Sequence, residues 1–485
     1  MLLEQLIEGL DDIQIMDDIK EVEISSIAYD SRKVTPGSLF VCIEGYKVDG
    51  HKYIREAVNK GAAALVIQKD VVMPEGLPVI KHSNPRMILA EVSARFYNRP
   101  SEKLKLIGVT GTKGKTTTTF MIKSILEQAG HKVGLIGTIA NYIGDRVVEA
   151  QRTTPESLEL QEMFADMLSQ GVDTVVMEVS SHSLDLYRVH ACEFDVGVFT
   201  NLTQDHLDFH LNFENYFNAK AKLFDLCKAG KANIDDEYGL RILEMGKCPM
   251  KSFGIKHTAD IKAKDIDIKP EGTKFKVETS KGEIEVSVPI PGIFSVYNSL
   301  SAISACLEFD AGSNDIIKGL ENLKVPGRAE TVETNGKFTV MVDYAHSPDS
   351  LKNILETIKG YAQGRIVVIF GCGGDRDRTK RPIMGRIAGE LADFTIISSD
   401  NPRTEEPEAI ISEIEEGIKG TKGEYIIIPD RQEAIKYAVK NAVEKDIVVI
   451  AGKGHETYQV FKDRIVHFDD REIATEAIRQ LMANS

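Results

Sequence analysis

Residues 108–119, GVTGTKGKTTTT, join an apolar segment to an amphipathic one, and this junction restricts the fold more than any other feature. The segment before it, LKLIGVTG, has the apolar character of a buried strand and stops on glycine. The segment after it, KTTTTFMIKSILEQAG, has the period of a helix and ends at Gly130. A glycine-rich turn between strand and helix points backbone N–H groups and the positive end of the helix dipole at an anion. We therefore predict a phosphate-binding loop inside an α/β domain.

The spacing of this loop departs by one residue from the common phosphate-binding pattern. That pattern places four residues between its first glycine and Gly-Lys-Ser/Thr, whereas five separate Gly108 from Gly114. Lys115 can neutralise the outer phosphates, and a threonine hydroxyl can bind Mg²⁺. A glycine turn beside a surface lysine is the simpler alternative, but successive threonines are poor helix formers, so local stability would not select them. The residues that we expect to line the phosphate site are Gly111, Thr112, Lys113, Gly114, Lys115, Thr116 and Thr117.

Apolar segments and turns alternate along most of the chain. Helical patterns lie between most of the expected strands, which predicts a parallel sheet with crossover helices. Residues 1–100 form a first such unit, and the polar, proline-bearing YNRPSEK that follows suits a domain boundary. The expected strands of the first two units are SLFVCIEG, AALVI, LKLIGVTG, KVGLIGT, VDTVVMEVSS and FDVGVFTNL, and YIREAVNKG is an expected helix.

Residues 260–290 differ, because apolar and polar residues alternate there around a Lys-Gly turn. This alternation predicts an antiparallel hairpin. A third α/β unit is expected beyond VPGRAE, with strands in FTVMVDYA, RIVVIFGCGG, FTIISSD, YIIIP and DIVVIAGKG. We predict an α/β protein with three domains in series, at residues 1–100, 101–325 and 326–485.

The charge balance and the cysteines restrict the possible partners. Lys and Arg number 59 and Asp and Glu number 74, so the net charge is −15. Such an acidic chain is not expected to bind nucleic acid or an anionic membrane over a wide surface. The six cysteines contain no C-x-x-C pair, which indicates reduced thiols. With no cationic leader and no apolar run of about 20 residues, we expect a cytoplasmic protein without a membrane span. No pattern encodes the oligomeric state, and we expect a monomer.

The segment TGTKGKTT resembles the loop of the Mur ligase family, which is related to folylpolyglutamate synthetase, and MEVSSH, TNLTQDHLDFH and YFNAKAKLF follow in the family's order. The resemblance implies an ATP-dependent ligase that makes an acyl phosphate and then an amide. It identifies Glu178 and His206 as similar to metal ligands and aligns Lys220 with a lysine that reacts with CO₂ to form N6-carboxylysine. That carbamate is an anion that can hold a second Mg²⁺. His210 is expected to be structural.

The resemblance extends to the third domain. IPGIFSVYNSLSA is similar to the family's adenine-side motif, with Ser295 where the family usually has asparagine, and implies roles for Tyr297 and Asn298 in ATP binding. VPGRAE and VDYAHSPDS match more closely. They imply that Arg328 reaches the γ-phosphate, where it would stabilise charge developing in the transfer. Asp343, with His346, is placed at the entrance to the third domain. The resemblance covers nearly the whole chain and is strongest at 106–220 and 325–460.

AYDSRKVTPGSLFVCIEGYKVDGHKYI resembles the uridine-nucleotide-binding domain of the family branch that adds the third residue of the peptide. The implied architecture is this domain, a central P-loop ATPase-like domain and a C-terminal Rossmann-like domain. Thr154 and Pro155 also suit a helix cap and first helical residue, and we expect both roles. The residues implied to bind the substrate, UDP-N-acetylmuramoyl-L-alanyl-D-glutamate, are Ser31, Thr153, Thr154, Ser180 and Arg188.

The tetrad Asp-Asn-Pro-Arg in SSDNPRTEEP resembles members that add meso-diaminopimelate. Diaminopimelate is lysine with an additional distal carboxylate, and a bidentate Arg403 can pair with that group. Asp400 and Asn401 can meet the distal ammonium. The residues implied to bind diaminopimelate are Arg376, Asp400, Asn401, Pro402, Arg403, Gly452 and Glu456. A lysine-adding ligase, a folylpolyglutamate-type ligase and a P-loop binding protein without catalysis are the alternatives.

Overall fold

The computed structural model describes residues 1–45, 48–72, 76–334 and 336–483. The chain divides into two compact units, Met1–Lys262 with Leu300–Asp315 and Ala263–Ser299 with Ile316–Ser485. In the described ranges, no helix combines the length and apolar character needed to cross a bilayer. The six cysteines are free thiols, as predicted. The α/β fold class is also confirmed, and parallel sheets dominate both units.

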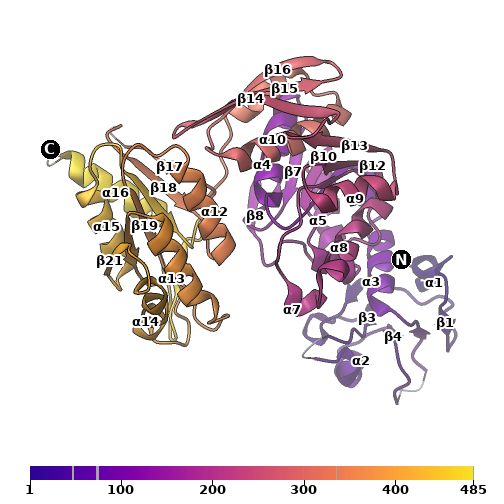
Figure 1. The fold of residues 1–485 in the computed structure, drawn as a ribbon. Helices are drawn as coiled ribbons and strands as arrows, with labels where there is room; N and C mark the ends of the chain where they lie inside the picture. The colour runs from indigo at the N-terminus through magenta and orange to yellow at the C-terminus, as the bar shows by residue number, and fades with distance from the viewer. Residues whose placement is uncertain (46–47, 73–75, 335, 484–485) are drawn as a thin grey trace. The chain divides into compact units, whose positions relative to one another are not determined.

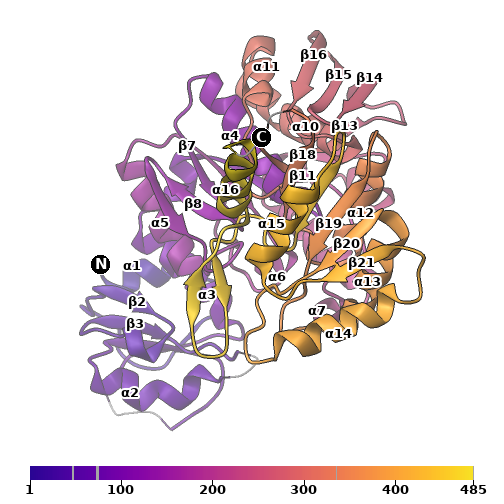
Figure 2. The ribbon, with the colours of Figure 1, turned by 90° about the vertical axis from the view of Figure 1, so that its left-hand side faces the viewer.

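The N-terminal part of the first unit is a sheet in the order β1-β5-β4-β3-β2, parallel except for β1. Alternate residues of β3 and β4 face different helices. Leu39 and Val41 pack in the cluster that contains α3, and Phe40 packs in the cluster that contains α2. Figure 2 shows α2 below β2 and β3. The elements are α1 (Leu3–Ile7), β1 (Gln14–Ile15), β2 (Ser26–Ala28), β3 (Ser38–Val41), α2 (Ile54–Asn59), β4 (Ala64–Ile67), β5 (Val79–Lys81) and α3 (Pro85–Phe96).

The central sheet of the first unit places β6 between β11 and β10, all parallel. Because parallel strands end at the same edge, the phosphate loop after β6 lies beside the residues that end β10 and β11. The strands are β6 (Lys105–Thr110), β7 (Val133–Ile136), β8 (Ala140–Ile143), β9 (Arg146–Glu149), β10 (Thr174–Glu178), β11 (Phe194–Phe199), β12 (Cys227–Asn233) and β13 (Met250–Gly254). The helices are α4 (Lys115–Gln128), α5 (Ser157–Ser169), α6 (Ser181–Asp185), α7 (Leu207–His210), α8 (Phe213–Ala221) and α9 (Glu237–Met245).

One detail of the predicted helix starts is wrong. We expected Thr154 to cap the helix that begins at Pro155, but α5 begins at Ser157 and its N-cap residue is Glu156. The Thr154 hydroxyl instead donates to the carbonyl oxygen of Glu178 at 2.9 Å. A buried carbonyl at the end of β10 needs a donor, so the tertiary contact replaces the local one.

The second unit contains a sheet in the order β17-β18-β22-β19-β20-β21, parallel except for β17. Both faces are covered, because Val368 and Phe370 pack with α12, α13 and α14, whereas Val367 and Ile369 pack with α15 and α16. Figure 1 shows these two helical layers. The elements are β17 (Glu330–Val332), β18 (Thr339–Asp343), α12 (Pro348–Lys359), β19 (Ile366–Phe370), α13 (Lys380–Leu391), β20 (Phe394–Ile397), α14 (Pro407–Ile418), β21 (Glu424–Ile427), α15 (Arg431–Asn441), β22 (Ile447–Ala451) and α16 (Asp470–Ala483).

The predicted hairpin is also present. β15 and β16 pair antiparallel, with Thr279 opposite Gly282 at the turn. Gly282 has a φ of +124°, which favours glycine at this position. The remaining elements are β14 (Ile261–Lys269), β15 (Gly272–Thr279), β16 (Gly282–Val288), α10 (Ile293–Cys306), α11 (Ser313–Glu321), β23 (Tyr458–Val460) and β24 (Ile465–His467).

Candidate active site

Two glycines, Gly111 and Gly114, adopt backbone conformations that the phosphate loop needs and that other residues rarely adopt. Gly111 has a φ of +145°, and a Cβ there would lie 1.9 Å from the Thr200 hydroxyl. Gly114 has a φ of +86° and is the N-cap residue of α4, so the first N–H groups of α4 are left without helical partners. Asn201 anchors the loop, because its Oδ1 accepts from the Lys113 N–H at 3.0 Å and its amide donates to the Lys113 carbonyl at 3.1 Å. Thr116 and Thr117 occupy the first turn of α4.

The ammonium groups of two predicted site residues share one carbonyl. Lys115 Nζ donates to Gly111 O and to Thr112 O, both at 3.0 Å, and Lys220 Nζ donates to Gly111 O at 2.8 Å. Lys220 lies on α8, is only 1% exposed and has its Nζ 4.5 Å from the centre of the Tyr216 ring. Burial, followed by the charge of Lys115, holds the pKa of Lys220 well below its usual value. A buried amine with a low pKa is more often neutral, and the neutral amine is the form that reacts with CO₂.

The Glu178 carboxylate at the end of β10 is held by threonines. It accepts from the Thr116 hydroxyl at 3.0 Å, from the Thr138 N–H at 2.8 Å and from the Thr138 hydroxyl at 3.1 Å. Thr138 is in turn 3.0 Å from the Thr153 hydroxyl. A carboxylate and a hydroxyl that meet beside a phosphate loop are oxygen ligands of the kind Mg²⁺ takes, so these residues fit the predicted metal.

A further predicted metal ligand is His206. Its side chain is half exposed, its ring is 5.0 Å from His182, and its Nδ1 is 3.7 Å from a carboxylate oxygen of Asp205. Lys113 Nζ lies 3.6 Å from the same carboxylate group. In the part of the chain that the structure describes, no three His, Cys, Asp or Glu side chains converge on a metal-sized position. Mg²⁺ commonly takes one or two protein carboxylates and completes its shell with phosphates and water.

Three of the residues predicted to bind the muropeptide are hydrogen-bonded to one another and to the backbone of Glu178. Thr154 donates to the Glu178 carbonyl and accepts from the Ser180 N–H at 3.2 Å. Arg188 Nη1 donates to the Thr154 carbonyl at 3.1 Å. Thr154, Ser180 and Arg188 therefore form one hydrogen-bonded group that also holds the end of β10.

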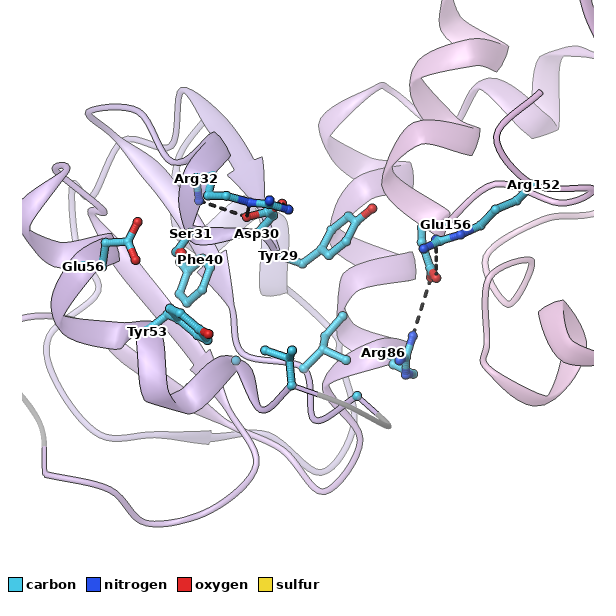
Figure 3. Close-up of a pocket in the computed structure, with 14 residues that line it drawn as sticks. Tyr29, Asp30, Ser31, Arg32, Phe40, Tyr53, Glu56, Arg86, Arg152 and Glu156 are labelled. Carbon is cyan, nitrogen blue, oxygen red and sulfur yellow. Dashed lines mark hydrogen bonds and ion pairs between the residues drawn. The ribbon is translucent and has the colours of Figure 1, made fainter. Parts of the chain in front are cut away.

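A pocket of about 600 Å³ contains the N-terminal candidate residue, Ser31 (Figure 3). Ser31 is 7% exposed and begins a short 3₁₀ turn whose N-cap residue is Asp30. Its carbonyl accepts from Lys60 Nζ at 2.9 Å. The rings of Phe40 and Tyr53 line the same end of the pocket, which gives it an apolar wall on which a planar base can pack. Other lining residues include Arg86, Arg152 and Glu156.

In the second unit, Asp343 ends β18 and accepts from the Ala329 N–H at 2.8 Å. Burial raises the pKa of Asp343, and the positive charge of Arg328 opposes that effect. The Arg328 guanidinium lies 4.8 Å from the centre of the Tyr344 ring. The Arg328 guanidinium thus packs on an aromatic face, and its charge acts on the Asp343 carboxyl.

The adenine-side candidates lie on α10. Asn298 and Tyr297 are half-buried there. The Ser295 hydroxyl donates to the Gly292 carbonyl at 2.6 Å and lies 3.3 Å from the Thr273 hydroxyl. Ser295 is therefore used to hold the start of α10, at the position where the family usually has asparagine.

The loops after β18, β20 and β22 meet at one edge of the second sheet. The Gly452 N–H donates to the Asp343 carbonyl at 3.0 Å, and a Cβ on Gly452, whose φ is +117°, would lie 2.7 Å from an Asp400 carboxylate oxygen. The Asn401 side-chain amide donates to Glu456 Oε2 at 2.8 Å. The structure thus brings Asp400, Asn401, Gly452 and Glu456 together, at the strand ends where ligands bind in open parallel sheets.

The Arg403 side chain belongs to the same group of loops. Arg403 has a φ of +55°, and its Nη1 donates to the Gly374 carbonyl at 2.8 Å. Gly374 packs closely on Pro402, because a Cβ on Gly374 would lie 1.8 Å from the Pro402 carbonyl oxygen. Arg376 is exposed on the loop after β19, which also contains Gly374. The loop after β19 and the loop after β20 therefore carry the two candidate arginines side by side.

Two polar residues in these groups, Thr138 and Lys453, lie outside the set predicted from the sequence. Lys453 is 0% exposed, and its Nζ lies 3.2 Å from Asn401 Oδ1 and 3.1 Å from Glu456 Oε2. A signal was available for Lys453, because it stands between Gly452 and Glu456 in AGKGHE. Thr138 carried no comparable signal, since its contact with Glu178 spans 40 residues.

Three family models match successive parts of the chain. They are the Mur ligase family catalytic domain at residues 23–97, the Mur ligase middle domain at residues 109–306 and the Mur ligase glutamate ligase domain at residues 327–454. A relative from Alkaliphilus metalliredigens is 50% identical over 485 residues, covering 99% of this chain and 98% of its own. The chain belongs to the Mur ligase family. The matched segments contain the phosphate loop, Glu178, Lys220 and the Asp400–Arg403 loop.

Two relatives and one solved structure carry the same name. The Alkaliphilus relative and one from Caldanaerobacter subterraneus, 50% identical over 95% of each chain, are both UDP-N-acetylmuramoyl-L-alanyl-D-glutamate–2,6-diaminopimelate ligases. A solved structure of a ligase with that name is 31% identical, with a TM-score of 0.72 and coverage of 95% of each chain. A Thermotoga maritima MurF ligase solved with ADP shares the fold, at 18% identity, a TM-score of 0.62 and coverage of 96% of this chain and 97% of its own.

Proposed function

We propose that the chain is an ATP-dependent ligase that adds meso-2,6-diaminopimelate to UDP-N-acetylmuramoyl-L-alanyl-D-glutamate, a step of peptidoglycan precursor synthesis. The observation that carries this function is end-to-end similarity, at about half identity, to ligases of that name. The geometry supports it, since the phosphate loop, the Glu178 carboxylate and the Asp400–Arg403 loop all lie at strand ends. The new amide joins the D-glutamate γ-carboxyl group to an amine of diaminopimelate.

ATP is proposed to bind at Gly111–Thr117, and Asn298, Arg328 and Asp343 are proposed as further ATP-binding residues. Thr116 and Glu178 would hold Mg²⁺, together with His206 and the carbamate of Lys220. When bound, Mg²⁺ supplies positive charge that stabilises the transferring phosphoryl group. The low pKa of the buried Lys220 amine supports its carbamylation, because the neutral amine is the nucleophile.

The reaction needs no protein nucleophile. A γ-carboxylate oxygen of D-glutamate attacks the γ-phosphorus, the bond to ADP breaks, and an acyl phosphate forms. The diaminopimelate amine then attacks the acyl carbon, giving a tetrahedral intermediate that expels phosphate and leaves an amide after loss of a proton. Lys115 and Arg328 stabilise the charge on the phosphoryl oxygens, so the chain acts by positioning and electrostatics.

Each substrate is assigned to one of the two groups of residues. The uridine end of the muropeptide would lie in the Ser31 pocket, and Thr153, Thr154, Ser180 and Arg188 would direct its peptide toward the phosphate loop. Arg403 and Arg376 would bind carboxylates of diaminopimelate, and Asp400, Asn401, Pro402, Gly452 and Glu456 would bind its distal amino acid group. A guanidinium pairs with a carboxylate but repels an ammonium, which is why Arg403 favours diaminopimelate over lysine.

The proposal includes a division into domains at residues 100 and 325, supported by three family-model matches that each fall inside one segment. We also propose a monomer that works in the cytoplasm, where nucleotide precursors of the cell wall are made. The acidic composition supports the absence of a nucleic-acid partner.

A phosphate-release assay tests this function. Purified protein is incubated with ATP, Mg²⁺, the UDP-muropeptide and either meso-diaminopimelate or L-lysine. We expect phosphate release only when the muropeptide and an amino acid are both present, with diaminopimelate the faster substrate. Faster reaction with lysine would make the chain a lysine-adding ligase. ATP hydrolysis without product, or competition by folate, would refute the proposal.

A further inference from the structure

One buried carboxylate outside the predicted site set holds three guanidinium groups. Glu156 Oε1 lies 2.9 Å from Arg152 Nη1 and 2.9 Å from Arg188 Nη2, and its Oε2 lies 3.5 Å from Arg86 Nη1. The Glu156 side chain is 9% exposed, whereas that of Arg152 is 51% exposed. Figure 3 shows Arg86 and Arg152 on either side of Glu156.

The three arginines come from separate elements of the first unit. Arg86 is in the first turn of α3, Arg152 precedes α5, and Arg188 follows α6. Glu156 is the N-cap residue of α5, yet its side chain makes no capping hydrogen bond there. The Glu156 carboxylate thus contacts the three arginines and does not accept a capping hydrogen bond from the first turn of α5.

This arrangement leaves surplus positive charge on the pocket wall. Three guanidiniums against one carboxylate leave this cluster with two surplus positive charges. Arg86 and Arg152 line the pocket, and Arg188 contacts the same carboxylate from outside the lining. The other acids in the lining have their own cations: Asp30 lies 2.7 Å from Arg32, and Glu56 lies 3.0 Å from Lys60. Outside the lining, Glu159 is engaged by Tyr29 and Lys33. With these pairs counted, the region around the pocket keeps an excess of positive charge, which suits a dianion.

We infer that Glu156 positions Arg86, Arg152 and Arg188 as a wall that binds the diphosphate of the uridine nucleotide, with Arg86 and Arg152 contacting the phosphate oxygens. This inference rests on the proposed function and adds Arg86, Arg152 and Glu156 to the residues predicted to bind the muropeptide substrate. The diphosphate carries about two negative charges and is bonded directly to the uridine, and Arg86, Arg152 and Ser31 line the same pocket. Guanidiniums bind phosphate oxygens through paired hydrogen bonds.

Glu156 acts by preventing the three like charges from separating. Without its carboxylate, the half-exposed Arg152 turns toward solvent and the buried Arg188 loses its counter-ion. The ligand would then have to order these side chains as it binds, which weakens affinity. Glu156 is a positioning residue, because it holds the arginines and not the substrate.

The test compares Arg86→Met, Arg152→Met and Glu156→Gln with a matched control, Arg146→Met. Arg146 is an exposed arginine on β9 that pairs with Asp166 and lies outside the pocket lining. Titration calorimetry measures binding of UDP and of uridine, and kinetics measure KM for the UDP-muropeptide and for ATP. Each test variant should weaken UDP binding about tenfold or more, while uridine binding and the KM for ATP stay within about twofold. The control should match the wild type in every measurement.

Several outcomes would overturn the inference. Equal weakening of UDP and uridine would mean that the arginines only support the pocket's structure, and melting temperatures would show the same loss. Unchanged UDP binding with a raised KM for the UDP-muropeptide would assign the wall to a peptide carboxylate. Unchanged UDP binding in Glu156→Gln alone would refute the positioning role. A wild-type protein that neither binds UDP nor forms product would instead refute the proposed function.

Discussion

Lys115 and Lys220 donate hydrogen bonds to the same carbonyl oxygen, that of Gly111, at 3.0 and 2.8 Å. Burial disfavours the ammonium form of Lys220 and lowers its pKa, and repulsion by the nearby positive charge of Lys115 adds to that effect. Conversion of Lys220 to a carbamate would replace this repulsion with attraction to Lys115. The pairing therefore favours an anion at the end of the Lys220 side chain.

Removal of the Lys220 amine should lower the ligase rate strongly, and a small carboxylic acid should restore part of that rate. We expect Lys220→Ala to lose at least about a hundredfold in kcat, because the variant lacks the predicted anionic ligand. Acetate or formate should restore part of the rate, and chloride at equal ionic strength should not. Ligase assays with increasing acetate measure this. Full activity of Lys220→Ala without any added acid would contradict the carbamate.

Thr138 should matter for the reaction although it lies outside the phosphate loop. Thr138→Val removes the hydroxyl that donates to Glu178 Oε2 at 3.1 Å but keeps the backbone donor to Oε1. We expect the Mg²⁺ concentration for half-maximal rate to rise about tenfold, since one charged hydrogen bond contributes roughly 1.5–3 kcal/mol. Thr138→Ser is the control and should retain wild-type behaviour. An unchanged Mg²⁺ dependence in Thr138→Val would mean that Glu178 is oriented without this hydroxyl.

Arg403 should set the choice of amino acid. Arg403→Met is expected to lower kcat/KM for diaminopimelate about a hundredfold, because the distal carboxylate loses a bidentate partner, while the slow reaction with lysine changes little. Competition assays with both amino acids give the ratio directly. Arg378→Met is the control, since it alters an exposed arginine on the neighbouring loop after β19 that pairs with Glu413. Unaltered discrimination in Arg403→Met would remove the specificity argument.

Lys453 should affect binding of diaminopimelate and not of ATP. Lys453→Met leaves the Glu456 carboxylate and the Asn401 carbonyl without their buried cation, so the two side chains lose their fixed orientation. We expect KM for diaminopimelate to rise about tenfold with KM for ATP unchanged. Lys436→Met is a matched control, since Lys436 also pairs with a glutamate three residues away but is exposed. Equal changes in both KM values would indicate a general loss of structure.

His455 should make the protein less stable in mild acid. Burial, followed by the charges of Arg328 and Arg471, lowers the pKa of His455 to about 4, and its Nδ1 is buried without a hydrogen-bond partner. Between pH about 6.5 and about 4 the unfolded chain binds a proton that the folded one does not, so stability falls as pH falls through this window. The full loss is on the order of 3 kcal/mol.

His455→Gln should therefore reduce the decline in melting temperature between pH 7 and pH 4.5. The comparison is made at both pH values on the same preparations, so that any constant effect of the substitution cancels. Parallel pH curves for the variant and the wild type would show that other groups cause the acid sensitivity.

Much of the fold followed from local patterns. The strand ending on glycine before a helix predicted β6, the phosphate loop and α4, since a left-handed Gly111 and Gly114 are required by the turn itself. The alternation of apolar and polar residues in 260–290 predicted an antiparallel hairpin, which the structure forms with β15 and β16. Thr154 shows where such reasoning fails, because its hydroxyl satisfies a strand-end carbonyl instead of capping the helix that follows.

The sequence by itself therefore determined the order of strands and helices and the segments that carry phosphate and amino acid chemistry, because hydrophobic period and turn residues act over a few positions. Only the tertiary structure decided which polar groups meet. Thr116 reaches Glu178 across 62 residues, and Lys453 reaches Asn401 across 52. Such pairs depend on which strand ends lie side by side in a sheet, and that order is set by packing of the whole unit rather than by any local pattern.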